Sequence, residues 1–367
     1  MNYKNIRPTI LIPPGEHIKE ELEEREWTQK EFAEILGVTP KTISNIIKGK
    51  QGITPEMANL IGKAFGTSAE VWMNLETNYR IRLTTDEEKE KAVEAKSILF
   101  DNLPINELKK KDWLKAGADI IDSIKNILGI NNITESYFES KLGVNFRKSD
   151  KKEQITNHAK IWVEMSKRIA EGFHKNITNY DKSKLIQVIK NLHKFSNKGN
   201  GIAEFIELLN ENGVIFFVLS HLSKTYIDGA SFLSDNNPVI VYTKRYDRID
   251  NFWFVIAHEL GHVIKHINNQ NDYFWDDLKD NNGDYTGIEK EADEIALDLL
   301  KKHEITVFFE DYNKIYEDDI IDCSKKIDIH PGIVVGILQH EKKLSYRYHN
   351  KLKGKVSNLI PDEYIKG

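Results

Sequence analysis

The most constraining feature of the chain is an apolar, aromatic stretch, residues 252–264, that contains the sequence HELGH at residues 258–262. Residues four apart stack on one face of an α-helix, so His258 and His262 can direct ring nitrogens at the same metal ion. Glu259 lies about 100° further round the helix, where it can reach a coordinated water without occupying a ligand position. The pattern predicts the metal helix of a zinc hydrolase, with Glu259 as its catalytic carboxylate.

A catalytic zinc site of this kind needs a third protein ligand from a second element. Residues 286–300 show one apolar stripe at helical spacing, formed by Ile288, Ala292, Ile295, Ala296 and Leu299. Glu289 lies next to this stripe and is the expected third ligand. Asp293, one turn later, is expected to accept a hydrogen bond from the outer nitrogen of a ligating histidine. Glu291 and Glu294 are rival ligands that the stripe places nearer solvent.

The alternative to a metal site is an ordinary helix with polar residues. With 12 histidines in the chain, chance alone would produce an H-E-x-x-H motif with a probability of roughly a few per cent. The second helix downstream favours the metal site. Manganese or iron could occupy the same ligands, because the donor types do not select zinc alone.

Residues from about 213 to 300 resemble the ImmA/IrrE family of zinc metallo-endopeptidases. Members carry H-E-x-x-H followed by a helix reading E-x-x-A-[ND]-x-x-A-x-x-L-L, which residues 289–300 match. Relatives often continue with Met-Pro, whereas this chain has Lys301-Lys302. The resemblance implies Zn²⁺ held by two histidines and Glu289, and cleavage of a regulatory protein, a repressor or antitoxin-like partner. A second oxyanion donor is not identified, and its candidates are His221, Tyr226 and His330.

Three apolar segments, residues 213–219, 226–233 and 238–242, are predicted as strands, with a turn at 234–237. A small sheet beside the metal helix would offer an edge for an extended peptide, and one hypothesis is that the substrate binds as an added strand. The alternative is that the strands only support the helix. Residues 268–285, rich in Asn and Asp, are expected to form a loop at the mouth of the site.

The N-terminal residues 14–79 break into short helices with clear start signals. Capping boxes are predicted at 28–31 and 67–70, and Thr-Pro helix starts at 39–40 and 54–55. A tight turn at 36–38 separates the second and third helices. This punctuation is typical of a helix-turn-helix.

Residues 27–50 resemble the XRE-type helix-turn-helix of HigA-like antidote proteins. The resemblance implies that a recognition helix, about residues 40–47, enters the major groove of operator DNA. The expected base-facing residues are Lys41, Thr42, Ser44 and Asn45, and the expected phosphate contacts are Gln29, Lys48 and Lys50. The few lysines near this helix give only a small positively charged surface for DNA phosphates. One copy would bind weakly, so a homodimer is expected. The alternative is a helical domain that serves only for protein contacts.

The 367 residues suffice for two or three domains. We expect a helix-turn-helix domain at 1–82, a helical linker region at 83–200 and a zinc peptidase domain at 201–367. A formal net charge of −5 gives no broad basic stripe. The single cysteine, Cys323, excludes a disulfide framework within the chain and fits a cytoplasmic localisation. Neither a signal peptide nor a membrane-spanning run is predicted.

The expected fold class is mainly α with a small α+β part: an N-terminal XRE-type helix-turn-helix bundle, a helical middle region and a C-terminal zincin-like domain with a small β-sheet. Further helices are expected at 85–100 (capped by residues 85–88), 104–116, 118–128, 151–175, 181–195, 318–329 and 331–343. Two functions fit. One is a DNA-binding regulator with zinc-dependent endopeptidase activity; the other is a HigA-like antitoxin or autorepressor whose zinc domain senses or binds a partner without hydrolysis.

Overall fold

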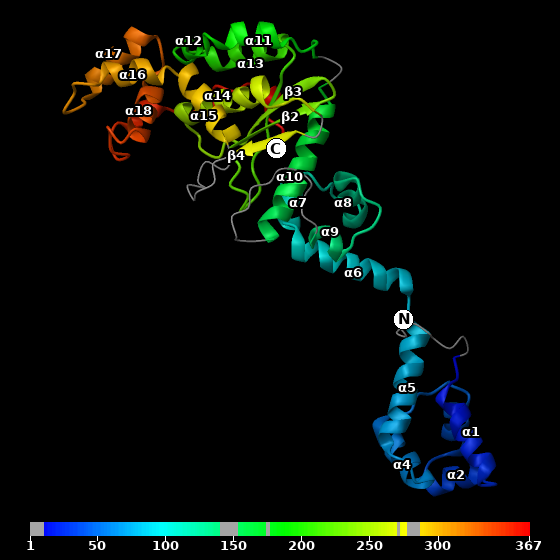
Figure 1. The fold of residues 1–367 in the computed structure, drawn as a ribbon. Coiled ribbons are helices and arrows are strands. Elements are labelled where there is room, and N and C mark those ends of the chain that lie inside the picture. Colours follow the sequence, from blue (N-terminus) through cyan, green and yellow to red (C-terminus); the bar gives the residue numbers. More distant parts are fainter. Residues whose placement is uncertain (1–10, 140–152, 174–176, 270–271, 277–286) are drawn as a thin grey trace. The chain divides into compact units, whose positions relative to one another are not determined.

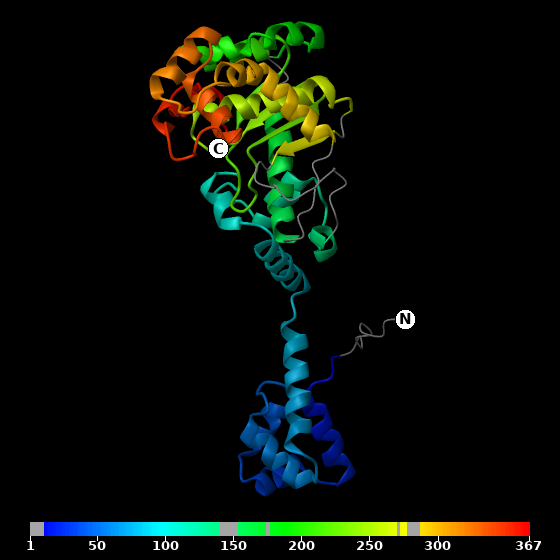
Figure 2. The same cartoon turned by 60° about the vertical axis from the view of Figure 1, so that its left-hand side comes forward.

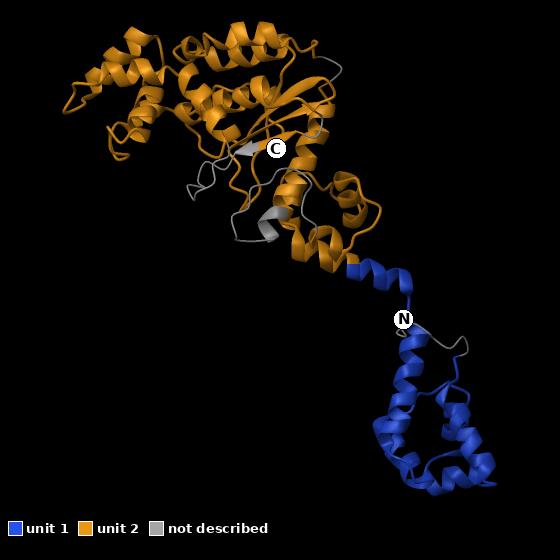
Figure 3. Cartoon of the chain, in the orientation of Figure 1, with its two compact units in different colours: residues 1–94 blue, residues 95–367 orange. Residues whose placement is uncertain are grey.

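The computed structural model describes residues 11–139, 153–173, 177–269, 272–276 and 287–367 (Figure 1). These residues form mainly helices together with a sheet of four strands. The predicted fold class is confirmed. The chain divides into two compact units, residues 1–94 and residues 95–367 (Figure 3). The finer division at residues 82 and 200 stays a prediction.

The first unit is a bundle of short helices around one apolar core. Its helices are α1 (Pro14–Glu24), α2 (Gln29–Leu36), α3 (Pro40–Ile47), α4 (Pro55–Phe65), α5 (Ala69–Thr84) and the start of α6 (Glu87–Asn102). Each of α1 to α4 buries one apolar face, as an amphipathic helix in a small domain must. The largest buried side chains of this core are Ile18, Phe32, Ile43, Ile61, Phe65 and Trp72.

The predicted starts of α2, α3 and α4 are confirmed. The Thr28 hydroxyl accepts from the backbone N–H of Glu31 at 3.2 Å, and the Glu31 carboxylate accepts from the backbone N–H of Thr28 at 2.7 Å. Thr39 and Thr54 cap α3 and α4, each followed by proline at the first helical position. Such caps satisfy backbone donors that the first turn leaves without partners.

One predicted cap is wrong, whereas the cap predicted within residues 85–88 is present. Helix α5 starts after Ser68 without a side-chain cap, because the Thr67 hydroxyl accepts instead from the indole N–H of buried Trp72 at 2.8 Å. Helix α6 is capped by Asp86, whose carboxylate accepts from the backbone N–H of Lys89 at 3.0 Å. A buried indole donor needs a partner, and it takes the hydroxyl that the cap would have used.

The second unit begins with helices that surround the sheet. They are α7 (Ile105–Lys110), α8 (Ile120–Leu128), α9 (Glu135–Glu139), α10 (Glu153–Glu171), α11 (Lys182–Ile189), α12 (Leu192–Ser196) and α13 (Gly201–Glu211). The expected helix 104–116 is shorter than predicted, since Asp112 has a positive φ of 56°. The expected helix 181–195 is two helices, broken at residues 190–191.

The sheet has the strand order β1-β3-β2-β4, formed by β1 (Ile215–Val218), β2 (Gly229–Ser234), β3 (Asn237–Tyr242) and β4 (Tyr273–Asp276). Strand β1 is parallel to β3, whereas β2 is antiparallel to both β3 and β4. Strand β2 starts later than predicted because Tyr226 has a positive φ of 54°. Strand β4 lies in the segment expected to be a loop; residues 270–271 and 277–286 of that segment lie outside the described residues.

The sheet is the middle layer of the second unit. Phe216 and Val218 face a core that includes α13 and α14 (Ile249–Lys265), and Ile215 and Phe217 face a core that includes α10. Figures 1 and 2 show α10 on one face of the sheet and α14 on the other. Both faces are buried, so β1 and β3 are continuously apolar instead of alternating.

The remaining elements complete the α14 side of the sheet. They are α15 (Gly287–Leu299), α16 (Lys302–Phe308), α17 (Glu317–Ile327), α18 (Pro331–His340), η2 (Asn350–Lys353) and η3 (Asp362–Tyr364). Helix α14 packs against both α15 and α18. Among the described residues, no helix combines the length and apolar character needed to cross a membrane.

Candidate metal centre and nucleic-acid interface

Three side chains from α14 and α15 converge on one point. The Nε2 atoms of His258 and His262 are 3.0 Å apart, and Glu289 Oε2 lies 3.4 Å from each of them. In a tetrahedral zinc site with bonds of about 2.0–2.2 Å, ligand atoms lie roughly 3.3–3.5 Å apart. The two distances to Glu289 fall in this range and the distance between the histidines is shorter, so the three atoms are close enough to share one metal ion. The sequence predicted all three residues.

Close packing of α14 on α15 brings Glu289 to the histidines. A Cβ atom placed on Gly261 would lie 3.0 Å from the Cα of Ala292. Glycine on one helix and alanine on the other therefore let the two backbones approach closely at the level of the site. The predicted stripe of α15 is corrected at its first residue, because Ile288 is 41% exposed and the buried face begins at Ala292.

Asp293 lies where the sequence predicted it. Its Oδ1 is 2.8 Å from Nδ1 of His258. A carboxylate only accepts hydrogen bonds, so Nδ1 of His258 carries the proton and Nε2 keeps its lone pair. That tautomer directs an acceptor atom toward His262 and Glu289.

A third histidine, which sequence reasoning missed, extends the group. Nδ1 of His266 lies 3.1 Å from Nδ1 of His262, and Nε2 of His266 lies 3.1 Å from Oε2 of Glu291. The rival ligand Glu291 therefore contacts His266 and not the metal position, and Glu294 pairs with Lys290 in solvent. The i, i+4 repeat of histidines on one helix was the available signal.

The protonation states also suit metal ligation. Burial raises the pKa of Glu289, but the His258 and His262 imidazoles lower it by more, so this carboxyl titrates well below its usual range. Burial lowers the pKa of His262. Near neutral pH the carboxylate is therefore anionic and the His262 imidazole neutral, as ligands must be. Glu289 Oε2 is buried and lies 3.4 Å from the Nε2 atoms of both histidines, so the three residues form a group that could hold a metal ion.

Glu259 is fully buried beside strand β2. A Cβ atom on Gly229 would lie 2.6 Å from Oε1 of Glu259 and 2.5 Å from Cγ1 of Val255. Glycine at the start of β2 thus leaves the space that the carboxylate occupies. The strand fixes where Glu259 can place a proton acceptor.

Strand β4 closes the side of the site next to β2. The ring of Phe274 stacks on His262, with centroids 4.5 Å apart and planes 10° from parallel. Residues 229–232 of β2 pair with residues 273–276, and the backbone N–H of Lys366 donates to the Val218 carbonyl of β1 at 2.8 Å. Strand β4 is therefore the edge strand on this side of the sheet, and the hypothesis that a substrate binds as an added strand stays a prediction.

The three candidates for a second oxyanion donor lie elsewhere. His330 caps α18, where its Nδ1 accepts from the backbone N–H of Gly332 at 3.0 Å. Tyr226 is 45% exposed and lies beneath the guanidinium of Arg245. His221 is half-buried, and partial burial together with the positive charge of Arg245 lowers its pKa. No contact between these three and the converging ligands is present among the described residues.

Helix α3 of the first unit has a buried apolar face and an exposed polar face, as the sequence predicted. Ile43, Ile46 and Ile47 are buried. The proposed base-facing and phosphate-facing side chains are exposed or half-buried: Gln29, Lys41, Thr42, Ser44, Asn45, Lys48 and Lys50. The Thr42 hydroxyl shares a 2.9 Å hydrogen bond with Thr39, which anchors the start of the helix.

Comparison with known proteins defines the class of the chain. Residues 18–72 match the helix-turn-helix family and residues 214–325 match the IrrE N-terminal-like domain. The structure and these matches describe a DNA-binding helix-turn-helix regulator joined to an IrrE-like domain.

Relatives of the first unit make the assignment more specific. An uncharacterized HTH-type transcriptional regulator, YddM of Escherichia coli K12, is 35% identical over 68 residues, 18% of this chain and 72% of the relative. Virulence-associated protein I of Dichelobacter nodosus is 31% identical over 87 residues, 23% of this chain and 79% of the relative. The chain belongs to the family of helix-turn-helix transcriptional regulators. Pseudomonas aeruginosa antitoxin HigA, solved with the higBA promoter, is 35% identical and covers 20% of this chain and 82% of its own, with a TM-score of 0.20.

Proposed function

We propose that this regulator is also a zinc-dependent endopeptidase that cleaves a regulatory protein, a repressor or an antitoxin-like partner. The observation that carries the proposal is the convergence of His258, His262 and Glu289 within 3.4 Å, with Glu259 beside them on α14. The intact glutamate supports hydrolysis, since a purely structural zinc site has no need of a general base.

In this proposal His258, His262 and Glu289 hold the ion, and Glu259 moves the proton. Zn²⁺ bound there would lower the pKa of a coordinated water and polarise a substrate carbonyl. Glu259 accepts the proton of the attacking water and passes it to the departing amine. The absence of a side chain at Gly229 leaves space for the Glu259 carboxylate. Asp293 fixes the tautomer of His258 through its 2.8 Å contact.

The peptidase is tested by Glu259→Gln in the full chain. We expect the variant to keep its zinc, because Glu259 is not a ligand, and to cleave about 10²–10⁴-fold more slowly than wild type. The probe is a purified repressor or antitoxin protein that has its own helix-turn-helix domain, and cleavage is followed by mass spectrometry of the fragments. Equal cleavage by both proteins, or none by zinc-loaded wild type, would contradict the proposal.

A second function, an antitoxin or autorepressor whose metal domain binds a partner without hydrolysis, is favoured by one observation. His258, His262 and Glu259 are at most 1% exposed, and Phe274 covers His262. A substrate must therefore displace part of this cover before it reaches the site. If regulation in cells survives Glu259→Gln but not Asn45→Ala, this second function is the correct one.

We further propose that a homodimer of the chain places α3 in the major groove of operator DNA. Lys41, Thr42, Ser44 and Asn45 would contact bases, and Gln29, Lys48 and Lys50 phosphates. These roles rest on the family assignment and on the exposure of the side chains. A cytoplasmic location is part of the same proposal, because the DNA lies there.

The DNA contacts are tested with a fragment from upstream of the chain's own coding region. Asn45→Ala is expected to weaken binding by about 5- to 150-fold, equivalent to about 1–3 kcal/mol for a bidentate base contact. Lys48→Ala is expected to lower the salt dependence by about one phosphate contact. Lys63→Ala, an exposed lysine on α4, serves as the control. Unchanged binding by Asn45→Ala would remove that residue from the interface.

A further inference from the structure

We infer that His266 and Glu291 are positioning residues that hold His262 in its metal-binding orientation. The inference rests on the metal site of the proposed function and adds two side chains to it. It starts from the chain of contacts that runs from the surface of α15 to His262, with 3.1 Å at each of its two steps.

The hydrogen bonds along this chain have one consistent direction. The Glu291 carboxylate can only accept, so Nε2 of His266 donates to it. With its proton on Nε2, His266 offers Nδ1 as an acceptor for Nδ1–H of His262. That leaves a lone pair on Nε2 of His262, the atom 3.0 Å from Nε2 of His258 and 3.4 Å from Glu289. The chain thus fixes the tautomer that a metal ion requires.

The environment of His266 suits a residue that orients another. Its side chain is 8% exposed and its backbone N–H donates to the His262 carbonyl at 2.8 Å at the end of α14. Its ring lies 5.1 Å from the His262 ring and 6.0 Å from Phe274. Both its position and its ring plane are therefore restrained.

Helix α15 supplies the outer partner for each of the two histidine ligands. Asp293 contacts His258 directly, and Glu291 reaches His262 through His266. Glu289 contributes its own oxygen to the group that could hold a metal ion. One helix therefore supplies three carboxylates with different roles. Glu289 is the third ligand, Asp293 orients His258, and Glu291 orients His262 through His266.

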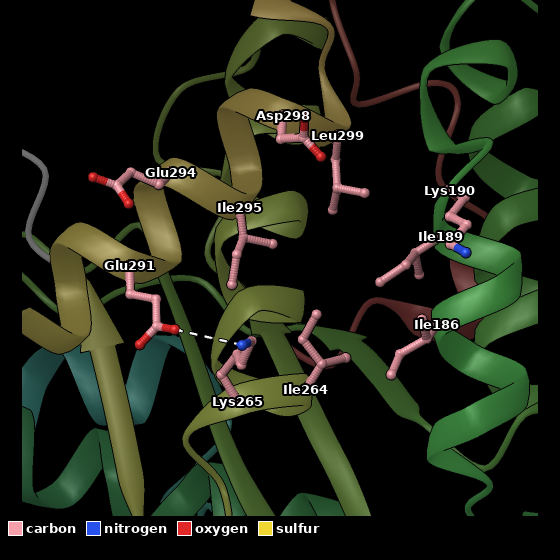
Figure 4. Close-up of a pocket in the computed structure, with 10 residues that line it drawn as sticks. All are labelled: Ile186, Ile189, Lys190, Ile264, Lys265, Glu291, Glu294, Ile295, Asp298 and Leu299. Atoms are coloured by element: carbon pink, nitrogen blue, oxygen red, sulfur yellow. Dashed lines mark ion pairs between the residues drawn. The ribbon is translucent and has the colours of Figure 1, made fainter.

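Glu291, the outer residue of this chain of contacts, lines a surface groove between α11, α14 and α15 (Figure 4). There the second oxygen of Glu291 lies 3.6 Å from the ammonium of Lys265. The two oxygens thus have different partners. Removal of Lys265 leaves the contact between Glu291 and His266 in place, which makes Lys265→Ala a matched control. Glu294→Ala, one turn along the same groove, is a second control.

The experiment measures Zn²⁺ affinity of the full chain by competition with a coloured chelator. His266→Phe keeps a ring against His262 and Phe274 but has no nitrogen, and His266→Gln keeps an acceptor and a donor without the ring. We expect His266→Phe to weaken Zn²⁺ binding about 10- to 100-fold. His266→Gln should retain affinity within about fivefold of wild type, as expected if the hydrogen bonds carry the effect.

Glu291→Ala is expected to weaken Zn²⁺ binding by a smaller factor than His266→Phe, and both controls to match wild type. Thermal unfolding of the metal-free variants checks that the fold is intact. Wild-type affinity in His266→Phe, or equal losses in His266→Phe and His266→Gln, would overturn the inference alone. A wild-type chain that binds no Zn²⁺ would overturn the proposed metal site as well.

Discussion

The geometry around Glu259 shows how a single backbone position makes room for the proposed general base. The carboxylate is fully buried, and its space exists only because β2 begins with Gly229, where a Cβ atom would lie 2.6 Å from Oε1. Burial of a carboxylate next to a metal position excludes bulk water from the proton acceptor. The reactive role of Glu259 thus depends on a residue with no chemistry of its own.

Gly229→Ala is expected to remove activity and destabilise the second unit. The added methyl group must displace Val255 or Glu259, which costs about 1–3 kcal/mol as overpacking, and cleavage should fall with the displaced carboxylate. Urea unfolding and the cleavage assay measure the two effects. Gly199→Ala is the control, because a Cβ atom there meets nothing within 4 Å. Wild-type stability and cleavage in Gly229→Ala would contradict this account.

Spacing along the sequence was enough to find His258, His262, Glu289 and Asp293, because helical periodicity alone places them on facing surfaces. It was not enough to assign a role to His266, because that role depends on a contact with Glu291 on another helix. The i, i+4 repeat of histidines indicates that His266 lies near His262, but it carries no information on the contact with Glu291 from another helix.

At the scale of elements, the site depends on two helices whose backbones nearly touch. A Cβ atom on Gly261 would lie 3.0 Å from the Cα and 3.3 Å from the Cβ of Ala292. Glu289 lies one turn before Ala292 on α15, so the distance between the helices controls the distance between ligands. Small residues at this crossing are therefore part of the metal site.

A graded series at Gly261 tests this dependence. Gly261→Ala should lower Zn²⁺ affinity modestly, and Gly261→Val should lower it further and destabilise the second unit by about 1–3 kcal/mol, because each added carbon pushes α15 outward. Zinc competition and urea unfolding measure both quantities. Equal Zn²⁺ affinity across the series would show that the helix separation does not control the site.

Several elements could be predicted because their signals are local. Thr28, Thr39 and Thr54 mark helix starts through their own turns. The cap predicted at Thr67 is absent because the Thr67 hydroxyl accepts from Trp72 instead. Strand β4 was not predicted because it forms by pairing with β2, some forty residues away in the sequence. Cross-strand pairing decides such short strands more than intrinsic propensity does.

The whole molecule contains two units, residues 1–94 and 95–367, each with its own apolar core. The proposed DNA-contacting side chains lie in the first, and the converging metal ligands lie in the second. The sequence indicated a DNA-binding part and a peptidase part through two independent resemblances, with predicted boundaries at residues 82 and 200. The boundary itself falls within α6, where composition gives no signal, because a continuous helix carries the chain from one unit to the next.

The central claim is that His258, His262 and Glu289 together hold one divalent cation, and metal content tests it most directly. Purified full-length chain, reconstituted with Zn²⁺ and dialysed, is assayed by plasma mass spectrometry beside His258→Ala and Glu289→Ala. The account predicts about one zinc per wild-type chain, and little in either variant, since a catalytic site needs all three ligands. Wild-type protein without zinc, or variants with as much zinc as wild type, would contradict it.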